Sequence, residues 1–124
     1  MRFKVTWSKP KNFKERSFDL SVEGVYLIGY RDARTNTRYI VWLGQGDVGS
    51  RLVDHYRNNS SVRKRLNQVG RVGYYRYAQV EEEDDRLDIE LGLYHNHGGS
   101  NFRNVIEPAG SGRYAKVEVQ ELFL

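Results

Sequence analysis

Two runs rich in β-branched and aromatic residues, at positions 24–30 and 38–43, flank a polar stretch at 32–37. That stretch contains Asp and Asn, which favour turns over regular structure. Two such runs joined by a short polar connection are typical of paired antiparallel strands. The pattern therefore predicts a β-hairpin over residues 24–43.

Two short helices are predicted to follow the hairpin. Glycines at 44 and 46 interrupt the second run and end its strand, and Asp47 behind them is a good N-cap. A helix over 48–57 is then expected, with apolar residues at helical spacing on its buried side: Val48, Leu52 and Tyr56. A second helix can begin at Ser60 or Ser61, run through Val69 and stop at Gly70, the usual position of a C-terminal glycine.

The remaining segments predict further strands and one more helix. Residues 72–80 alternate as a third strand, with Tyr75 and Tyr77 on one face and Tyr74 and Arg76 on the other. These tyrosines can form cross-strand pairs or platforms for nucleic-acid bases. Residues 84–96 predict a helix with one apolar stripe, made of Leu87, Leu91 and Tyr94. Residues 115–124 predict a terminal strand, and residues 3–7 allow another at the N-terminus.

This order of elements predicts an α+β fold. We expect a small, mainly antiparallel central sheet of three core strands flanked by helices, with extra terminal strands as additions. All 124 residues fit a single domain, because a chain of this length builds one hydrophobic core.

Composition argues against a membrane protein, a disulfide-stabilised protein and a secreted protein. No stretch approaches the roughly 20 apolar residues that cross a bilayer, so no membrane partner is expected. The chain has no cysteine, which excludes disulfides and thiolate metal sites. The first seven residues lack the continuous apolar segment of a secretory signal, and a cytoplasmic location is therefore expected.

Charge is distributed unevenly around a formal net charge of +4. Residues 1–16 carry six basic side chains and residues 51–76 carry seven, whereas residues 81–90 carry seven acidic ones. This segregation predicts one basic face and one acidic face. A basic face suits the phosphate backbone of nucleic acid, and a solvated, solubilising surface is the alternative.

A set of motifs recurs in a fixed order along the predicted elements: Gly24-Val-Tyr26, Trp42-Leu-Gly44, Arg51 with His55 one turn later, Glu90 and Asn101. Placed on a hairpin, a helix, a strand and a second long helix, this set resembles the GIY-YIG endonuclease family over about residues 23–104. The resemblance implies a metal-dependent endonuclease that hydrolyses phosphodiester bonds in nucleic acid, with DNA favoured over RNA. It also implies that Tyr26 is the general base, that Glu90 binds Mg²⁺ or Mn²⁺, and that Asn101 braces the site.

The chemistry of these side chains suits phosphodiester cleavage. Arg51 is a planar, permanently charged fork that can grip two phosphate oxygens. His55 can hydrogen-bond a tyrosine hydroxyl or take its proton. Glu90 offers the hard carboxylate oxygen that Mg²⁺ prefers, and Mg²⁺ commonly takes only one or two protein carboxylates.

Each of these residues also has an ordinary structural role open to it. Tyr26 can be a half-buried strand aromatic, Arg51 a surface arginine, and Glu90 the partner of Arg86 one turn earlier on its helix. Similarly, the His95-x-His97 pair lacks further ligands at metal spacing, and Gly44-x-Gly46 lacks the rest of a dinucleotide-binding pattern.

Trp42 is the main departure from the family, which usually has tyrosine there. An indole offers one N–H donor and cannot accept a proton. In an active nuclease Trp42 would shape the pocket. The alternative is a catalytically silent nucleic-acid-binding module that keeps the basic cleft and has lost turnover with Trp42. A third hypothesis is a protein-interaction domain that binds a basic partner through the acidic run at 81–88.

Overall fold

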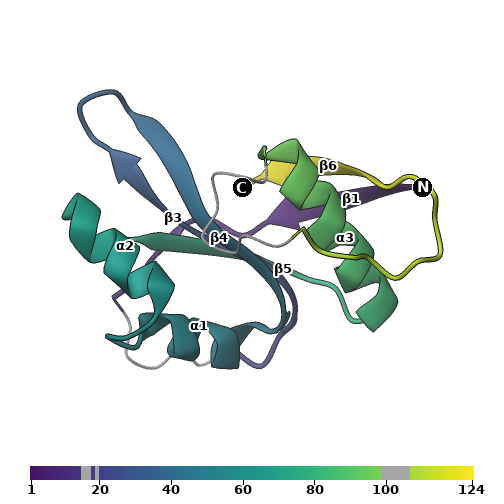
Figure 1. Ribbon diagram of the computed structural model, residues 1–124, viewed down its shortest axis with the longest axis horizontal. Helices are drawn as coiled ribbons and strands as arrows, with labels where there is room; N and C mark the ends of the chain where they lie inside the picture. The colour runs from purple at the N-terminus through teal and green to yellow at the C-terminus, as the bar shows by residue number, and fades with distance from the viewer. Residues whose placement is uncertain (15–17, 19, 99–106) are drawn as a thin grey trace.

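The computed structural model describes residues 1–14, 18, 20–98 and 107–124 (Figure 1). The chain forms six strands and three helices in these parts. They follow in the order β1 (Arg2–Trp7), β2 (Lys11–Asn12), β3 (Glu23–Asp32), β4 (Thr37–Asp47), α1 (Val48–Tyr56), α2 (Ser61–Val69), β5 (Tyr74–Gln79), α3 (Glu83–Asn96) and β6 (Glu118–Phe123).

The strands form two sheets. The central sheet has four antiparallel strands in the order β2-β5-β3-β4, so the predicted hairpin of β3 and β4 is confirmed and β4 lies at an edge. The short strand β2, which the sequence pattern did not predict, pairs with the start of β5. The two terminal strands β1 and β6 form a separate parallel pair, in which Arg2 lies opposite Glu118. The fold is α+β, as expected.

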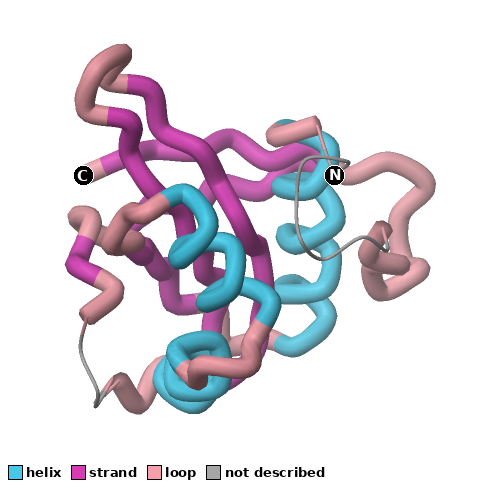
Figure 2. Tube along the Cα trace, turned by 60° about the vertical axis from the view of Figure 1, so that its left-hand side comes forward, coloured by secondary structure: helices cyan, strands magenta, loops and turns pink. Residues whose placement is uncertain are grey.

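Helices cover both faces of the central sheet, because β3 is apolar on both sides. Val25 and Leu27 face a core shared with α3, β1 and β6, whereas Tyr26 and Ile28 face a core shared with α1 and α2. Figure 2 shows the strands running between α1 and α2 on one side and α3 on the other. Residues that follow one another on β3 therefore serve opposite layers.

The helix ends follow the predicted capping pattern. The Asp47 side chain accepts a hydrogen bond from the backbone N–H of Ser50, which makes it the N-cap of α1. Ser60 caps α2 in the same way, and Gly70 ends that helix in the left-handed conformation with φ 65°.

The prediction that glycines 44 and 46 end the strand is wrong. Strand β4 continues to Asp47, and Gly44 and Gly46 pair with Tyr26 and Gly24 of β3. The missing side chains allow the two strands and their neighbours to approach closely: a methyl group at Gly24 would lie 2.0 Å from the carbonyl oxygen of Ala78.

The predicted apolar stripe of α3 is also wrong. Ile89 and Leu93 are the helix's buried apolar residues, whereas Leu87, Leu91 and Tyr94 are half-buried. The reason is that α3 packs against the sheet on one side and is covered by the C-terminal segment on the other. Asp88 anchors that segment, since its carboxylate accepts hydrogen bonds from Ser111 and Arg113.

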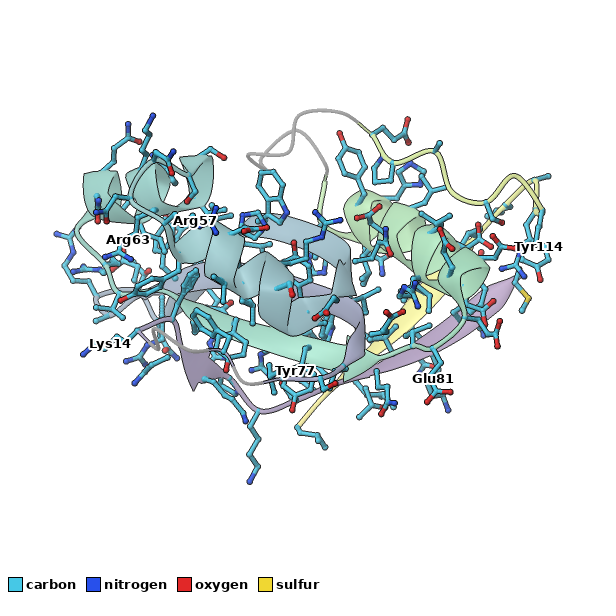
Figure 3. All side chains as sticks on the ribbon, turned by 90° about the horizontal axis from the view of Figure 1, so that it is seen from below. Lys14, Arg57, Arg63, Tyr77, Glu81 and Tyr114 are labelled. Carbon is cyan, nitrogen blue, oxygen red and sulfur yellow. The ribbon has the colours of Figure 1, made fainter. Side chains whose placement is uncertain are left out.

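Basic side chains from both basic stretches lie at one end of the molecule, and the segregation into one basic and one acidic face stays a prediction. Figure 3 shows Lys14, Arg57 and Arg63 at the end that carries α1 and α2, and Glu81 at the end that carries α3. None of the described helices is long and apolar enough to cross a membrane.

Candidate active site

A cleft of about 550 Å³ opens at the free edge of β4, between α1 and α3. Five of the six site residues expected from the sequence line it: Tyr26, Trp42, Arg51, His55 and Glu90. They come from β3, β4, α1 and α3, so the fold brings together side chains that are 64 positions apart at the extremes, from 26 to 90. Asn101 lies outside the described residues.

Tyr26 and His55 form the polar centre of the cleft. Tyr26 is 2% exposed, and its hydroxyl oxygen lies 2.8 Å from Nε2 of His55. The tyrosine ring crosses the neighbouring strand directly over Gly44, where an added Cβ would lie 2.4 Å from the hydroxyl oxygen. Gly44 therefore leaves the space that the tyrosine needs to reach His55.

Burial determines the protonation of this pair. It raises the pKa of Tyr26 well above its ordinary value, against the opposing effects of the Arg51 charge and of Trp42 as a hydrogen-bond donor. Burial likewise lowers the pKa of His55 to about 4, although the neighbouring Asp54 acts in the opposite direction. At neutral pH a protonated phenol thus faces a neutral imidazole, which can accept a hydrogen bond from it.

Trp42 closes one side of the cleft. Its ring centroid lies 4.7 Å from that of His55, at an interplanar angle of 53°. Trp42 is on the same face of β4 as Gly44, because alternate residues of a strand share a face. Its indole therefore packs against the imidazole of His55 beside the Tyr26 contact.

Arg51 and Glu90 place opposite charges in the cleft without pairing to each other. Within the described residues neither side chain makes a hydrogen bond or an ion pair. Burial raises the pKa of Glu90 to about 7, and the Arg51 charge partly offsets this. The cleft thus contains a guanidinium and a carboxylate that are both available to a ligand.

The alternative role of Glu90, pairing with Arg86 one turn earlier, does not form. Arg86 is buried and turns the other way, with Nη1 3.1 Å from a carboxylate oxygen of Glu23 and Nε donating to Oε1 of Gln45 at 3.2 Å. This network ties α3 to β3 and β4 one turn before Glu90. It fixes the helix from which Glu90 reaches the cleft.

The donor set fits a cation that needs few protein ligands. In the described part of the chain no three or more His, Asp or Glu side chains come close enough together to hold a metal ion among them. Glu90 is nevertheless a partly buried carboxylate without a partner, facing an open cleft. Mg²⁺ and Mn²⁺ suit such a site, because they accept a single carboxylate together with waters and phosphate oxygens.

Sequence reasoning missed three polar residues of the cleft wall. Gln45 lies between the two glycines of β4, and its link to buried Arg86 has no sequence signal. Asp54 and Glu107 add carboxylates to the lining, and Glu107 also contacts His95. Glu107 lies just before the residues that Asp88 anchors, Ser111 and Arg113, and no motif predicts that contact.

Comparison of the chain with known proteins finds no relative. No family model, no curated protein and no solved structure matches the chain. The likeness to GIY-YIG endonucleases therefore stays a prediction that rests on the residues and their arrangement.

Proposed function

We propose that this protein is a metal-dependent endonuclease that hydrolyses phosphodiester bonds in nucleic acid, with DNA as the favoured substrate. One observation carries the proposal: a single cleft combines a proton-accepting pair, a free guanidinium and a free carboxylate. Those are the three functions that phosphodiester hydrolysis requires, namely a base for water, donors for the phosphate oxygens and a site for a cation.

Tyr26 and His55 supply the base. The Tyr26 oxygen accepts a proton from the attacking water while its own proton passes to Nε2 of His55, 2.8 Å away. This concerted path avoids a free phenolate, which the buried position of Tyr26 disfavours. A bound phosphate adds negative charge beside His55 and raises the pKa of the imidazole, so it becomes a better acceptor when substrate is present.

Arg51 and Glu90 act on the phosphate from opposite walls. Arg51 donates to the phosphate oxygens, and its charge stabilises the negative charge that develops as water attacks. Glu90 holds Mg²⁺ or Mn²⁺, and the bound cation supplies Lewis-acid stabilisation of the same oxygens. Because Glu90 must be ionised to bind a cation, activity should rise with pH through its pKa of about 7.

The test is cleavage of supercoiled plasmid and of labelled single-stranded and duplex DNA and RNA, with Mg²⁺ or Mn²⁺. Glu90→Gln and Tyr26→Phe should abolish cleavage, and His55→Gln should slow it by roughly 10²- to 10⁴-fold, the usual contribution of a positioned base. Glu82→Gln makes the same chemical change at an exposed position beside the start of α3 and should cleave as the native protein does. Full activity in Glu90→Gln would refute the assignment.

A second candidate is a nucleic-acid-binding module without turnover, and Trp42 is the observation that favours it. The indole occupies the position from which the family's tyrosine offers a hydroxyl, and it packs on His55 instead. A folded protein that binds nucleic acid in a salt-dependent manner but cuts none of these substrates would establish this function in place of the first.

A further inference from the structure

Two arginines lie directly opposite each other near the tip of the β3–β4 hairpin. Arg31 and Arg38 are cross-strand partners in the antiparallel register, and both are exposed. Like charges at directly opposed positions destabilise a sheet. The pair therefore carries an energetic cost that the hairpin itself does not explain.

Neutral partners hold both guanidinium groups in place. Arg31 donates from Nη1 to Oδ1 of Asn36 at 3.1 Å, and the Arg38 guanidinium lies 5.5 Å from the centroid of the Tyr74 ring. Each contact orients the planar fork while leaving other N–H donors free. The Asn12 amide adds a further donor beside them.

These groups line one cavity. It has a volume of about 280 Å³ and lies on the side of the sheet opposite Tyr26, with Pro10 and Val72 completing its apolar rim. None of its lining residues is acidic, and neither arginine forms an ion pair within the part of the chain that the structure describes. Arg76 on the neighbouring strand adds positive charge, and the Arg38 charge contributes to lowering its pKa, after burial.

From this geometry we propose that Arg31, Arg38 and Asn12 form a phosphate-binding subsite, separate from the cleft at Gly44, that anchors nucleic acid without reading its sequence. The arginine forks supply bidentate donors of the kind that phosphate oxygens prefer. An anion between the two guanidinium groups removes their repulsion. The cavity would accept either a backbone phosphate or the phosphate of a free nucleotide.

The spacing suits one nucleic acid that contacts both sites. Arg38 and Gly44 are six positions apart on β4, which corresponds to about 20 Å along a strand. That length equals roughly six base pairs of duplex at ~3.4 Å each. The subsite would thus hold the substrate at least half a helical turn away from the scissile bond, around the edge of β4, because the cavity lies on the face of the sheet opposite Tyr26. This role goes beyond the proposed cleavage chemistry.

Binding is measured in EDTA, so that cleavage does not enter the readout. The arms are a fluorescent 20-base-pair duplex, a nucleoside monophosphate and inorganic phosphate, each titrated with the native protein, with Arg31→Ala/Arg38→Ala and with Lys4→Ala/Lys9→Ala. The second double variant removes the same charge at exposed positions that do not line the cavity. Removing the opposed arginines relieves repulsion, so that double variant should fold at least as stably as the native protein.

We expect the arginine double variant to bind the duplex roughly tenfold or more weakly. The slope of log K against log salt should also become less steep by about 2, since each lost phosphate contact removes ~0.9 from its magnitude. The lysine control removes the same charge elsewhere on the basic surface, so it should weaken duplex binding less than the arginine variant and should leave the mononucleotide and phosphate arms unchanged. A loss confined to the mononucleotide and phosphate arms identifies free phosphate as the source and still supports the subsite. Unchanged binding in all three arms overturns it.

The outcome is independent of the proposed nuclease activity. Arginine-dependent binding by a protein that cuts nothing leaves the subsite standing and removes the nuclease assignment. Cleavage by a protein whose binding does not depend on Arg31 and Arg38 supports the nuclease assignment and removes the subsite.

Discussion

Replacing Glu90 with Gln should stabilise the metal-free protein at alkaline pH. Burial raises the pKa of Glu90 from 4.5 to about 7, so ionising it in the folded state costs free energy that the unfolded chain does not incur. The full cost of such a change in pKa is ~3 kcal/mol. Glu90 keeps some contact with water, and solvent screening reduces the expected gain to about 1–2 kcal/mol.

The pH dependence has a definite sign. A carboxyl group whose pKa is raised on folding binds more protons in the folded state, so native stability falls as pH rises from about 4.5 to about 7 and stays low above that. Gln cannot ionise and lacks this loss. The free energy of unfolding of Glu90→Gln should therefore match that of the native protein near pH 4 and exceed it near pH 8.

Urea denaturation followed by circular dichroism at pH 4, 6 and 8, with EDTA present, measures this difference. Glu82→Gln is the control, because that side chain is exposed and makes no capping hydrogen bond, so its difference from the native protein should not grow with pH. A gain for Glu90→Gln that is absent at pH 8, or equal at all pH values, would refute the view of Glu90 as a partly buried carboxylate without a partner.

Adding Mg²⁺ at pH 8 should make the native protein more stable than Glu90→Gln. A cation at 100 times its dissociation constant stabilises the protein that binds it by ~2.7 kcal/mol. The native protein should gain this stability at pH 8 and Glu90→Gln should not. Equal gains in both proteins would place the cation elsewhere.

Two other substitutions test the packing around the cleft. Gly44→Ala should cost about 1–3 kcal/mol of stability and displace Tyr26 from His55, since the new Cβ would lie 2.4 Å from the buried hydroxyl oxygen. Urea denaturation measures the loss of stability, and the cleavage assay measures the effect on Tyr26. Native-like values in both assays would contradict the close contact. Asp88→Asn should cost about 1–3 kcal/mol at pH 7, because the 2% exposed carboxylate accepts hydrogen bonds from Ser111 and Arg113. Those bonds lower the pKa of Asp88 despite its burial, so the carboxylate stabilises the folded protein at neutral pH and this stabilisation is lost in acid. The difference in free energy of unfolding between the native protein and Asp88→Asn should therefore shrink in urea titrations at falling pH. A difference that grows would contradict this account.

The sequence predicted the features that depend on near neighbours. The β3–β4 hairpin, the Asp47 and Ser60 caps and the Gly70 stop each follow from a few adjacent residues, and all are present. The alternation in β5 was also correct, with Tyr75 and Tyr77 facing the core of α1 and α2. Local signals suffice for such features, because turn and cap geometry is determined within one or two turns of chain.

Long-range contacts decided what the sequence could not. Helix α3 has two apolar stripes, and only its position between the sheet and the C-terminal segment makes Ile89 and Leu93 the buried one. The parallel pairing of β1 with β6 joins the two ends of the chain, and no local pattern specifies that register. The continuation of β4 through Gly44 and Gly46 depends on the close approach of β3. Glycine permits that approach, but its presence in the sequence does not predict a continued strand.

The candidate site divides in the same way. Sequence motifs named Tyr26, Arg51, His55 and Glu90, because the type and order of these residues are visible in one dimension. Tertiary structure alone placed them around one cleft, buried the Tyr26–His55 pair and left Arg51 and Glu90 without partners. Protonation and availability to a ligand depend on desolvation and on neighbouring charges, and both arise only when distant elements pack together.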